Sequence, residues 1–190
     1  MLSRTPSPLA NFLWNPQGPG GHACQIYSSE SQLIDTLTGY VGGALWNGDA
    51  VVVVATQAHT DALEARLRES GLDLGFLRAS NRYVSISAQA MLARISLDGI
   101  PDEDLFADAV GQALQRAGAP ARRVRIFGEM VALLWERARY ADALRLEEIW
   151  NRYLAGRAVP LLCAYPRHDF NAAPRELSAA VERAHATFVA

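Results

Sequence analysis

The sequence predicts a three-layer α/β fold, a mostly parallel sheet of about five strands with helices on both faces. Apolar runs typical of strands alternate along the chain with segments whose apolar residues recur at helical spacing. Residues 50–55, Ala-Val-Val-Val-Val-Ala, are continuously apolar, as expected of a parallel strand covered on both faces. With 190 residues, half of them hydrophobic, the chain can bury a sizeable core.

The N-terminal half begins with an irregular arm, predicted for residues 1–21 because prolines and glycines interrupt it repeatedly. Residues 22–190 are expected to form one domain. Ser29-Glu30-Ser31-Gln32 is a capping-box pattern that begins a helix, and Asn47-Gly48 ends it. The elements predicted in this half are strands at 22–27, 50–55 and 83–87, the last at a sheet edge, and helices at 29–46 and about 58–70.

The C-terminal half contains the stretch that we expect to organise the fold, at 124–135. It reads as a central strand that opens directly into a helix, with Gly128 at the turn and Glu129 at the carboxyl end of the strand. Ligand crevices of open α/β sheets lie at such strand ends, so Glu129 either contacts a ligand or only caps the following helix. The elements predicted in this half are helices at 88–97, 102–117, from Met130 to Leu154 in two runs, and 174–189, and strands at 123–127 and 159–165.

The composition excludes several classes of function. Net charge is −2, so the chain has no overall basic field that would favour direct nucleic-acid binding or an anionic membrane surface. All 18 basic residues are Arg, which excludes a phosphate-loop lysine, a Schiff-base lysine and a lysine general base. No leader or apolar membrane span is evident, and the two cysteines are too few for a disulfide framework. We therefore expect a cytoplasmic protein with reduced cysteines.

Five motifs, in order along the chain, resemble those of the MEDS domain, the methanogen/methylotroph sensory domain of prokaryotic signal transduction. The resemblance covers about residues 20–170. The motifs are His22-x-Cys24-x-x-Tyr27, Trp46-Asn47-Gly48-Asp49, Phe127-Gly128-Glu129-Met130-Val131, Ala143-Leu144-Arg145-Leu146-Glu147-Glu148-Ile149-Trp150-Asn151 and Leu161-Leu162-Cys163-Ala164-Tyr165-Pro166.

The resemblance implies an input domain for small molecules such as simple hydrocarbon derivatives, in a RecA-like fold that has lost its phosphate loop. Residues 27–31, Tyr-Ser-Ser-Glu-Ser, agree with that loss because they contain neither Gly nor Lys. The resemblance also implies a protein partner such as a histidine kinase or a transcription regulator. No output module follows residue 190, so signalling through another chain is expected, and a homodimer is an open alternative.

Four side chains are expected near the ligand crevice: Tyr27, Glu129, Tyr165 and His168 follow or end three predicted strands. Tyr and His suit a small organic ligand with one polar group, although both tyrosines are equally compatible with core positions that have satisfied hydroxyls. His59 is expected either at the same rim or in solvent, and His185 in solvent.

His22 and Cys24 lie two residues apart on a strand, so their side chains leave the same face. If the last strand lies beside the first, Cys163 comes near Cys24, and His168 would complete a His/Cys set suited to zinc or another thiophilic metal. These four residues are thus candidates both for ligand binding and for a metal. The alternative is that both cysteines are buried small hydrophobes, and the sequence requires no cofactor.

The remaining signals favour structural roles. Trp135 and Trp150 are expected in the core, Glu147 on a solvated helix face, and Arg125 at the surface or on a partner. Neither a Gly-x-Ser-x-Gly elbow nor a Gly-x-Gly-x-x-Gly turn is present, so no enzymatic activity is predicted. Two other function classes stay open: a degenerate nucleotide-binding regulatory module, and a metal- or thiol-dependent redox sensor or enzyme that uses His22, Cys24 and Cys163.

Overall fold

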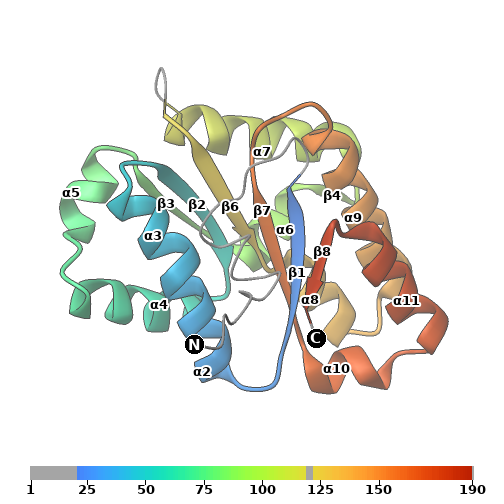
Figure 1. Cartoon of the computed structure of the whole chain (residues 1–190). Coiled ribbons are helices and arrows are strands. Elements are labelled where there is room, and N and C mark those ends of the chain that lie inside the picture. The colour runs from blue at the N-terminus through green and yellow to red at the C-terminus, as the bar shows by residue number, and fades with distance from the viewer. Residues whose placement is uncertain (1–20, 119–121, 190) are drawn as a thin grey trace.

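A computed structural model describes residues 21–118 and 122–189, so the arm expected at 1–21 lies outside the described residues except for Gly21. The main sheet has six strands, all parallel, in the order β3-β2-β6-β7-β1-β8. The fold class is therefore the predicted α/β class, with one strand more than expected (Figure 1). The strands are β1 (His22–Tyr27), β2 (Ala50–Ala55), β3 (Tyr83–Ser87), β6 (Val124–Gly128), β7 (Leu161–Pro166) and β8 (Thr187–Val189).

Helices cover both faces of this sheet (Figure 1). On one face lie α2 (Glu30–Leu37), the π-helical turn η1 (Thr38–Gly42), α3 (Gly43–Trp46), α4 (Gln57–Glu69) and α5 (Leu74–Ala79). On the other face lie α6 (Ala88–Arg94), α7 (Glu103–Ala117), α8 (Met130–Glu136), α9 (Tyr140–Leu154) and α11 (Arg175–Ala184), with α10 (Arg167–Ala172) following β7 at the carboxyl edge.

The apolar run of β2 supplies both halves of the core. Val52 and Val54 belong to the cluster under α6–α9, whereas Val51 and Val53 belong to the cluster under α2–α4. Successive side chains of a strand point to opposite faces, so a strand buried on both faces needs apolar residues throughout.

Two expected boundaries are wrong. The last helix ends at Ala184 instead of Val189, and residues 187–189 pair with β1 as the sixth strand. The helix expected at 88–97 ends at Arg94, and residues 96–101 form a small antiparallel hairpin of β4 (Ser96–Leu97) and β5 (Ile100–Pro101). Its turn residues both have positive φ, 51° at Asp98 and 83° at Gly99, a conformation that Asp-Gly adopts readily in tight hairpins.

Buried side chains confirm one structural expectation and correct another. Trp135 and Trp150 are both 1% exposed in the core, as expected. Arg125 is not a surface residue: it is buried, 3.5 Å from the Asp49 carboxylate, with its guanidinium over the ring of Tyr40. The surface interpretation failed because Tyr40 of η1 and Asp49, just before β2, lie against the amino end of β6.

Candidate functional site

Glu129 lies at the carboxyl end of the central strand β6, as expected, and its side chain is buried. One carboxylate oxygen accepts a hydrogen bond of 2.6 Å from the backbone N–H of Thr56, the residue that caps α4. The other oxygen contacts Nδ1 of His59. Glu129 occupies the N-cap position of α8, but its side chain makes no hydrogen bond to the start of that helix. It ties the end of β6 to the start of α4 instead.

His59 lies between two carboxylates. Nδ1 contacts Glu129 and Nε2 contacts Glu30, which is exposed in the first turn of α2. Burial by itself would lower the pKa of His59, but the hydrogen bonds and charges of Glu129 and Glu30 outweigh it and raise that pKa to about 9. At neutral pH the group is therefore one imidazolium shared by two carboxylates. His59 was expected either at the rim of the ligand crevice or in solvent, and the structure supports the position at the rim.

Tyr27 belongs to the same group at the carboxyl edge. Its buried ring stands edge-on to the His59 ring, with centroids 6.4 Å apart. Burial raises the pKa of the Tyr27 hydroxyl, and Glu30 and Glu129 add to that effect. The hydroxyl therefore stays protonated and able to donate. We call Tyr27, Glu30, His59 and Glu129 the edge group.

Tyr165 and His168 do not join the edge group. Tyr165 is fully buried on the other face of the sheet, where its hydroxyl donates a hydrogen bond of 2.6 Å to Glu147. The side chain of His168 is 93% exposed and contacts only the neighbouring Asp169 among the described residues. The four side chains expected around one crevice thus lie in three different surroundings.

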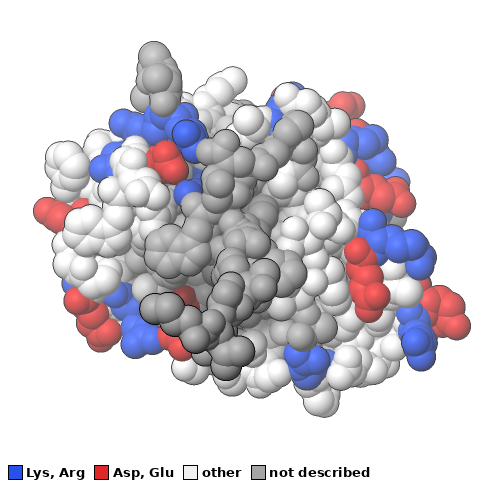
Figure 2. Space-filling model, viewed as in Figure 1, with Lys and Arg blue, Asp and Glu red and all other residues white. Residues whose placement is uncertain are grey.

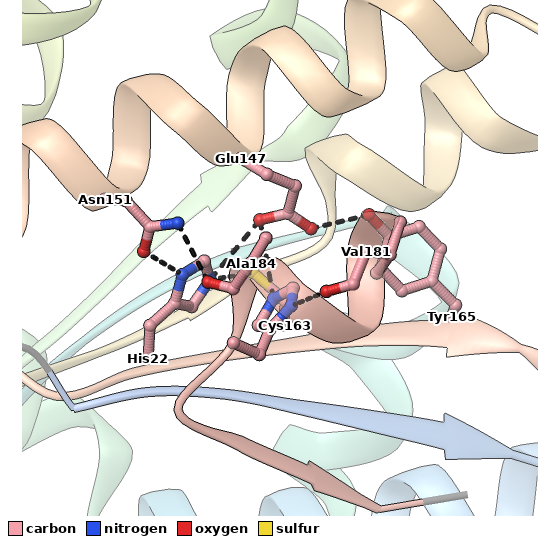
Figure 3. Close-up of polar contacts among 8 residues, drawn as sticks. His22, Glu147, Asn151, Cys163, Tyr165, Val181 and Ala184 are labelled. Carbon is pink, nitrogen blue, oxygen red and sulfur yellow. Dashed lines mark hydrogen bonds and ion pairs between the residues drawn. The ribbon is translucent and has the colours of Figure 1, made fainter. Parts of the chain in front are cut away.

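A second polar group is buried between the sheet and α9 (Figure 3). Its members are His22 of β1, Glu147 of α9, Cys163 of β7 and His185, which follows α11. His22 Nε2 lies 3.3 Å from Cys163 Sγ and 3.4 Å from Glu147 Oε2, and His185 Nε2 lies 3.5 Å from the same oxygen. We call these four residues the buried group.

Residues around the buried group hold its side chains in place. His22 Nδ1 contacts Asn151 Oδ1 at 2.9 Å, and His185 Nδ1 contacts the carbonyl oxygen of Val181 at 2.7 Å (Figure 3). Burial lowers the pKa of His22 to about 3, with His185 contributing, and burial raises the pKa of both Glu147 and Cys163. The protein environment alone thus favours uncharged forms of these three side chains.

The sequence identified two members of the buried group and missed the other two. Glu147 is 0% exposed, not on a solvated face, and the expectation that His185 lies in solvent is also wrong. The position of Glu147 carried a signal: it stands four residues after Ala143 and three before Trp150, on the apolar side of its helix. No comparable signal marks His185.

Cys24 and His168 were proposed for the same site as His22 and Cys163. Cys24 and Cys163 are register partners on β1 and β7, which confirms that the last strand of the predicted set lies beside the first. Both cysteines are 0% exposed. The cluster of possible metal ligands among the described residues contains Cys163 but neither Cys24 nor His168.

A pocket of about 340 Å³ lies along the edge strand β3, between α6 and α7. Its lining includes the apolar side chains of Ile86, Met91 and Ala113 and the charged side chain of Arg94. None of its lining residues belongs to the edge group. It is therefore a separate place where a small apolar molecule could bind.

Charged side chains are interspersed on the face shown in Figure 2, where acidic and basic residues lie mainly along the rim. Among the described residues visible in this view, charges of both signs are mixed. Among the helices of the described residues, none combines the length and the apolar character needed to cross a membrane.

Comparison with known proteins gives one family and one fold. Residues 21–186 match the family model described as "MEthanogen/methylotroph, DcmR Sensory domain", or MEDS. A solved KaiC-like protein from the hyperthermophilic archaeon Pyrococcus horikoshii OT3 is similar in structure, with a TM-score of 0.58 and 14% sequence identity over 90% of this chain and 72% of that one. No curated protein matches the sequence. The structural likeness shows a RecA-like fold.

Proposed function

We propose a function from one premise: this chain belongs to the MEDS family of sensory domains. Membership indicates a sensory role in signal transduction. We propose that the domain binds a small organic molecule at the carboxyl edge of its sheet, in contact with the edge group. We further propose that it passes the signal to a protein partner, such as a histidine kinase or a transcription regulator.

The observation that carries this proposal is the buried carboxylate of Glu129. A charged side chain at the end of a central strand is costly to bury, and this one is held by Thr56 and His59 at the edge where ligand crevices form. With one imidazolium and two carboxylates, the edge group carries a net charge of −1. That charge favours a ligand with a hydroxyl or amino donor, whose apolar part would pack against Tyr27.

The same contacts suggest how binding would be transmitted. Glu129 is the last residue before α8, and its carboxylate also holds the start of α4. A donor from the ligand would compete with His59 for that carboxylate and so alter the entry of both helices. Binding shifts the conformation only if the ligand prefers one arrangement over the other. We therefore propose Met130–Ala138 and its entry turn as the responding element.

A thermal-shift screen of the full chain tests the proposal. The probes are small alcohols, amines, carboxylates and halogenated alkanes, after native mass spectrometry has identified any molecule that copurifies. For a probe that stabilises the wild type, Glu129→Gln should weaken affinity roughly 10- to 100-fold, because a hydrogen bond to a charged group contributes about 1.5–3 kcal/mol. The measurement is the concentration dependence of the melting temperature.

Ala90→Leu is the matched control, because Ala90 is exposed and lines the separate pocket beside β3. We expect this variant to bind the probe as the wild type does. The reverse pattern, with binding kept in Glu129→Gln and lost in Ala90→Leu, would move the site to that pocket. If no probe class stabilises the wild type and no molecule copurifies, the proposal of a small organic ligand is wrong.

A further inference from the structure

We propose that the buried group is a four-coordinate metal site, best suited to zinc, with His22 Nε2, Glu147 Oε2, Cys163 Sγ and His185 Nε2 as ligands. The inference is independent of the sensory function proposed above, because none of these residues belongs to the edge group. It also differs from the set expected from the sequence, since Glu147 and His185 replace Cys24 and His168.

The spacing of the four atoms suits one small cation. All four lie within 4.8 Å of one another, and three of their separations are 3.3 Å (His22 Nε2 to Cys163 Sγ), 3.4 Å (His22 Nε2 to Glu147 Oε2) and 3.5 Å (His185 Nε2 to Glu147 Oε2). Zinc bonds to nitrogen and oxygen are about 2.0–2.2 Å long and those to sulfur about 2.3 Å, so tetrahedral ligands stand roughly 3.3–3.8 Å apart. These three separations already fall in this range, and a separation at the 4.8 Å limit would have to shorten by about 1 Å for the four atoms to meet at a common centre.

Two of the four atoms are otherwise orphaned. Glu147 Oε2 and His185 Nε2 are buried and have no hydrogen-bond partner among residues 21–118 and 122–189. Their mutual distance of 3.5 Å is too long for a good N–H···O hydrogen bond. Leaving a buried polar atom unsatisfied costs about 1–3 kcal/mol, more if it is charged. A shared metal ion would satisfy both atoms at once.

The surrounding hydrogen bonds present the correct atoms to that centre. Asn151 donates from Nδ2 to the carbonyl oxygen of Ala184, so its Oδ1 accepts from His22 Nδ1. His185 Nδ1 likewise donates to the carbonyl oxygen of Val181. Both histidines are then left with an unprotonated Nε2, the form that binds a metal.

Glu147 is held in the same way. The Tyr165 hydroxyl donates to Glu147 Oε1 at 2.6 Å, which leaves Oε2 directed at the centre. Such partners, which bind the far atom of each ligand, are typical of metal sites in proteins. Three of the four ligands therefore have their orientation set from outside the group.

The donor set favours zinc. One thiolate and one carboxylate balance the charge of a divalent ion, and two neutral imidazoles add none, so the buried centre would be neutral overall. Two nitrogens, one sulfur and one oxygen in a tetrahedral arrangement suit zinc, and four protein ligands are typical of structural sites. The ion would join β1, β7 and α9 to the turn between α11 and β8, and so hold the C-terminal segment on the sheet.

Metal content of the full chain, purified without a His tag from zinc-supplied medium, tests the proposal. We expect about one zinc per chain in the wild type and in Cys24→Ala, and less than about a tenth of that in Cys163→Ala. Cys24 is the matched control because it is equally buried, on the adjacent strand, and outside the group. A wild type that remains without metal after incubation with zinc, or a Cys163→Ala variant that keeps a full equivalent, overturns the proposal.

Cobalt substitution decides the matter even if Cys163 variants fail to fold. In the wild type and in Cys24→Ser, bound cobalt should show a thiolate-to-cobalt charge-transfer band together with visible bands of tetrahedral cobalt. In a folded Cys163→Ser the charge-transfer band should be absent. A wild-type spectrum without that band overturns the proposal, as does loss of the band in a folded Cys24→Ser. In the metal-free alternative, a protonated Glu147 donates a hydrogen bond to one histidine. This alternative predicts a wild-type spectrum without the charge-transfer band.

Discussion

Two carboxylates from different elements contact His59 and favour the protonated, positively charged form of its imidazole. Glu129 comes from the end of β6 and Glu30 from the first turn of α2. Burial opposes protonation, yet the two acidic neighbours raise the pKa of His59 to about 9. The side chain of Glu30 is 69% exposed, so solvent screens its share of the interaction.

This residue gives the folded state a specific dependence on pH. Because the pKa of His59 rises from 6.5 to about 9 on folding, its stabilisation is fully present below pH 6.5 and is lost as the pH rises through about 9. After allowance for screening, we expect its contribution to be on the order of 1–2 kcal/mol. Urea unfolding of the wild type at about pH 7 and pH 9.5 should show this loss.

His59→Gln is the control for that pH dependence. Glutamine can hydrogen-bond to one carboxylate but carries no titrating charge, so the variant should be less stable near neutral pH and lose less stability toward pH 9.5. If the variant loses as much free energy of unfolding over that interval as the wild type, the effect belongs to other titrating groups.

At the residue scale, the sequence predicted the positions of Glu129 and Tyr27 because a parallel strand pattern specifies which residues stand at strand ends. It could not predict the environment of Glu147. A carboxylate among arginines on a helix is normally solvated, and only the packing of α9 on β1 and β7 shows that this one faces His22 and Cys163. Such partners are set by tertiary structure.

At the scale of elements, the C-terminal segment shows tertiary pairing overriding helical periodicity. Leu177, Val181 and Phe188 have helical spacing, which predicted a helix through Val189. The helix ends instead at Ala184, whose carbonyl oxygen accepts a hydrogen bond from Asn151 Nδ2. The backbone N–H of Ala186 then donates a hydrogen bond to the carbonyl oxygen of His22. Residues 187–189 gain ladder hydrogen bonds along β1 that a longer helix would have left unused.

Asn151→Ala should loosen this segment specifically. The substitution leaves both the Ala184 carbonyl oxygen and His22 Nδ1 without their partner, at a cost of about 1–3 kcal/mol. If the substitution lowers the free energy of local opening of this segment by that amount, amide hydrogen exchange at Thr187–Val189 should accelerate roughly 5- to 150-fold. Exchange in β2 should change little. Glu148→Ala, an exposed position on the same helix, is the control and should leave both regions unchanged. Equal acceleration in β2 and β8 would show instead that the whole domain is destabilised.

At the scale of the whole molecule, the three-layer α/β layout was predictable from the sequence because alternating strands and helices admit few arrangements, whereas its RecA-like character was implied only by the resemblance to the MEDS domain. The sequence did not predict three short elements, because each is too short to show a clear hydrophobic periodicity. They are the sixth strand, the small hairpin and α5. The layout also raises the alternative of a nucleotide-binding module, since the turn between β1 and α2 lies at the carboxyl edge.

The start of α2 argues against that alternative. Ser29 Oγ already accepts from the backbone N–H of Gln32, and Gln32 Oε1 accepts from that of Ser28. These are the N–H groups that would otherwise bind a phosphate, and the Glu30 carboxylate in the first turn repels one. The capped turn and the charge of Glu30 are thus unfavourable for a polyphosphate.

We therefore expect millimolar MgATP to shift the melting temperature by less than about 1 °C relative to magnesium chloride at matched ionic strength. A ligand present at 100 times its Kd would stabilise the fold by about 2.7 kcal/mol, which corresponds to roughly 5–10 °C for a domain of this size. Glu30→Gln removes the repelling charge and serves as the sensitive variant. A shift of several degrees in the wild type would show that the capped turn opens to admit a nucleotide, and the edge group would then have to be reinterpreted as part of a phosphate site.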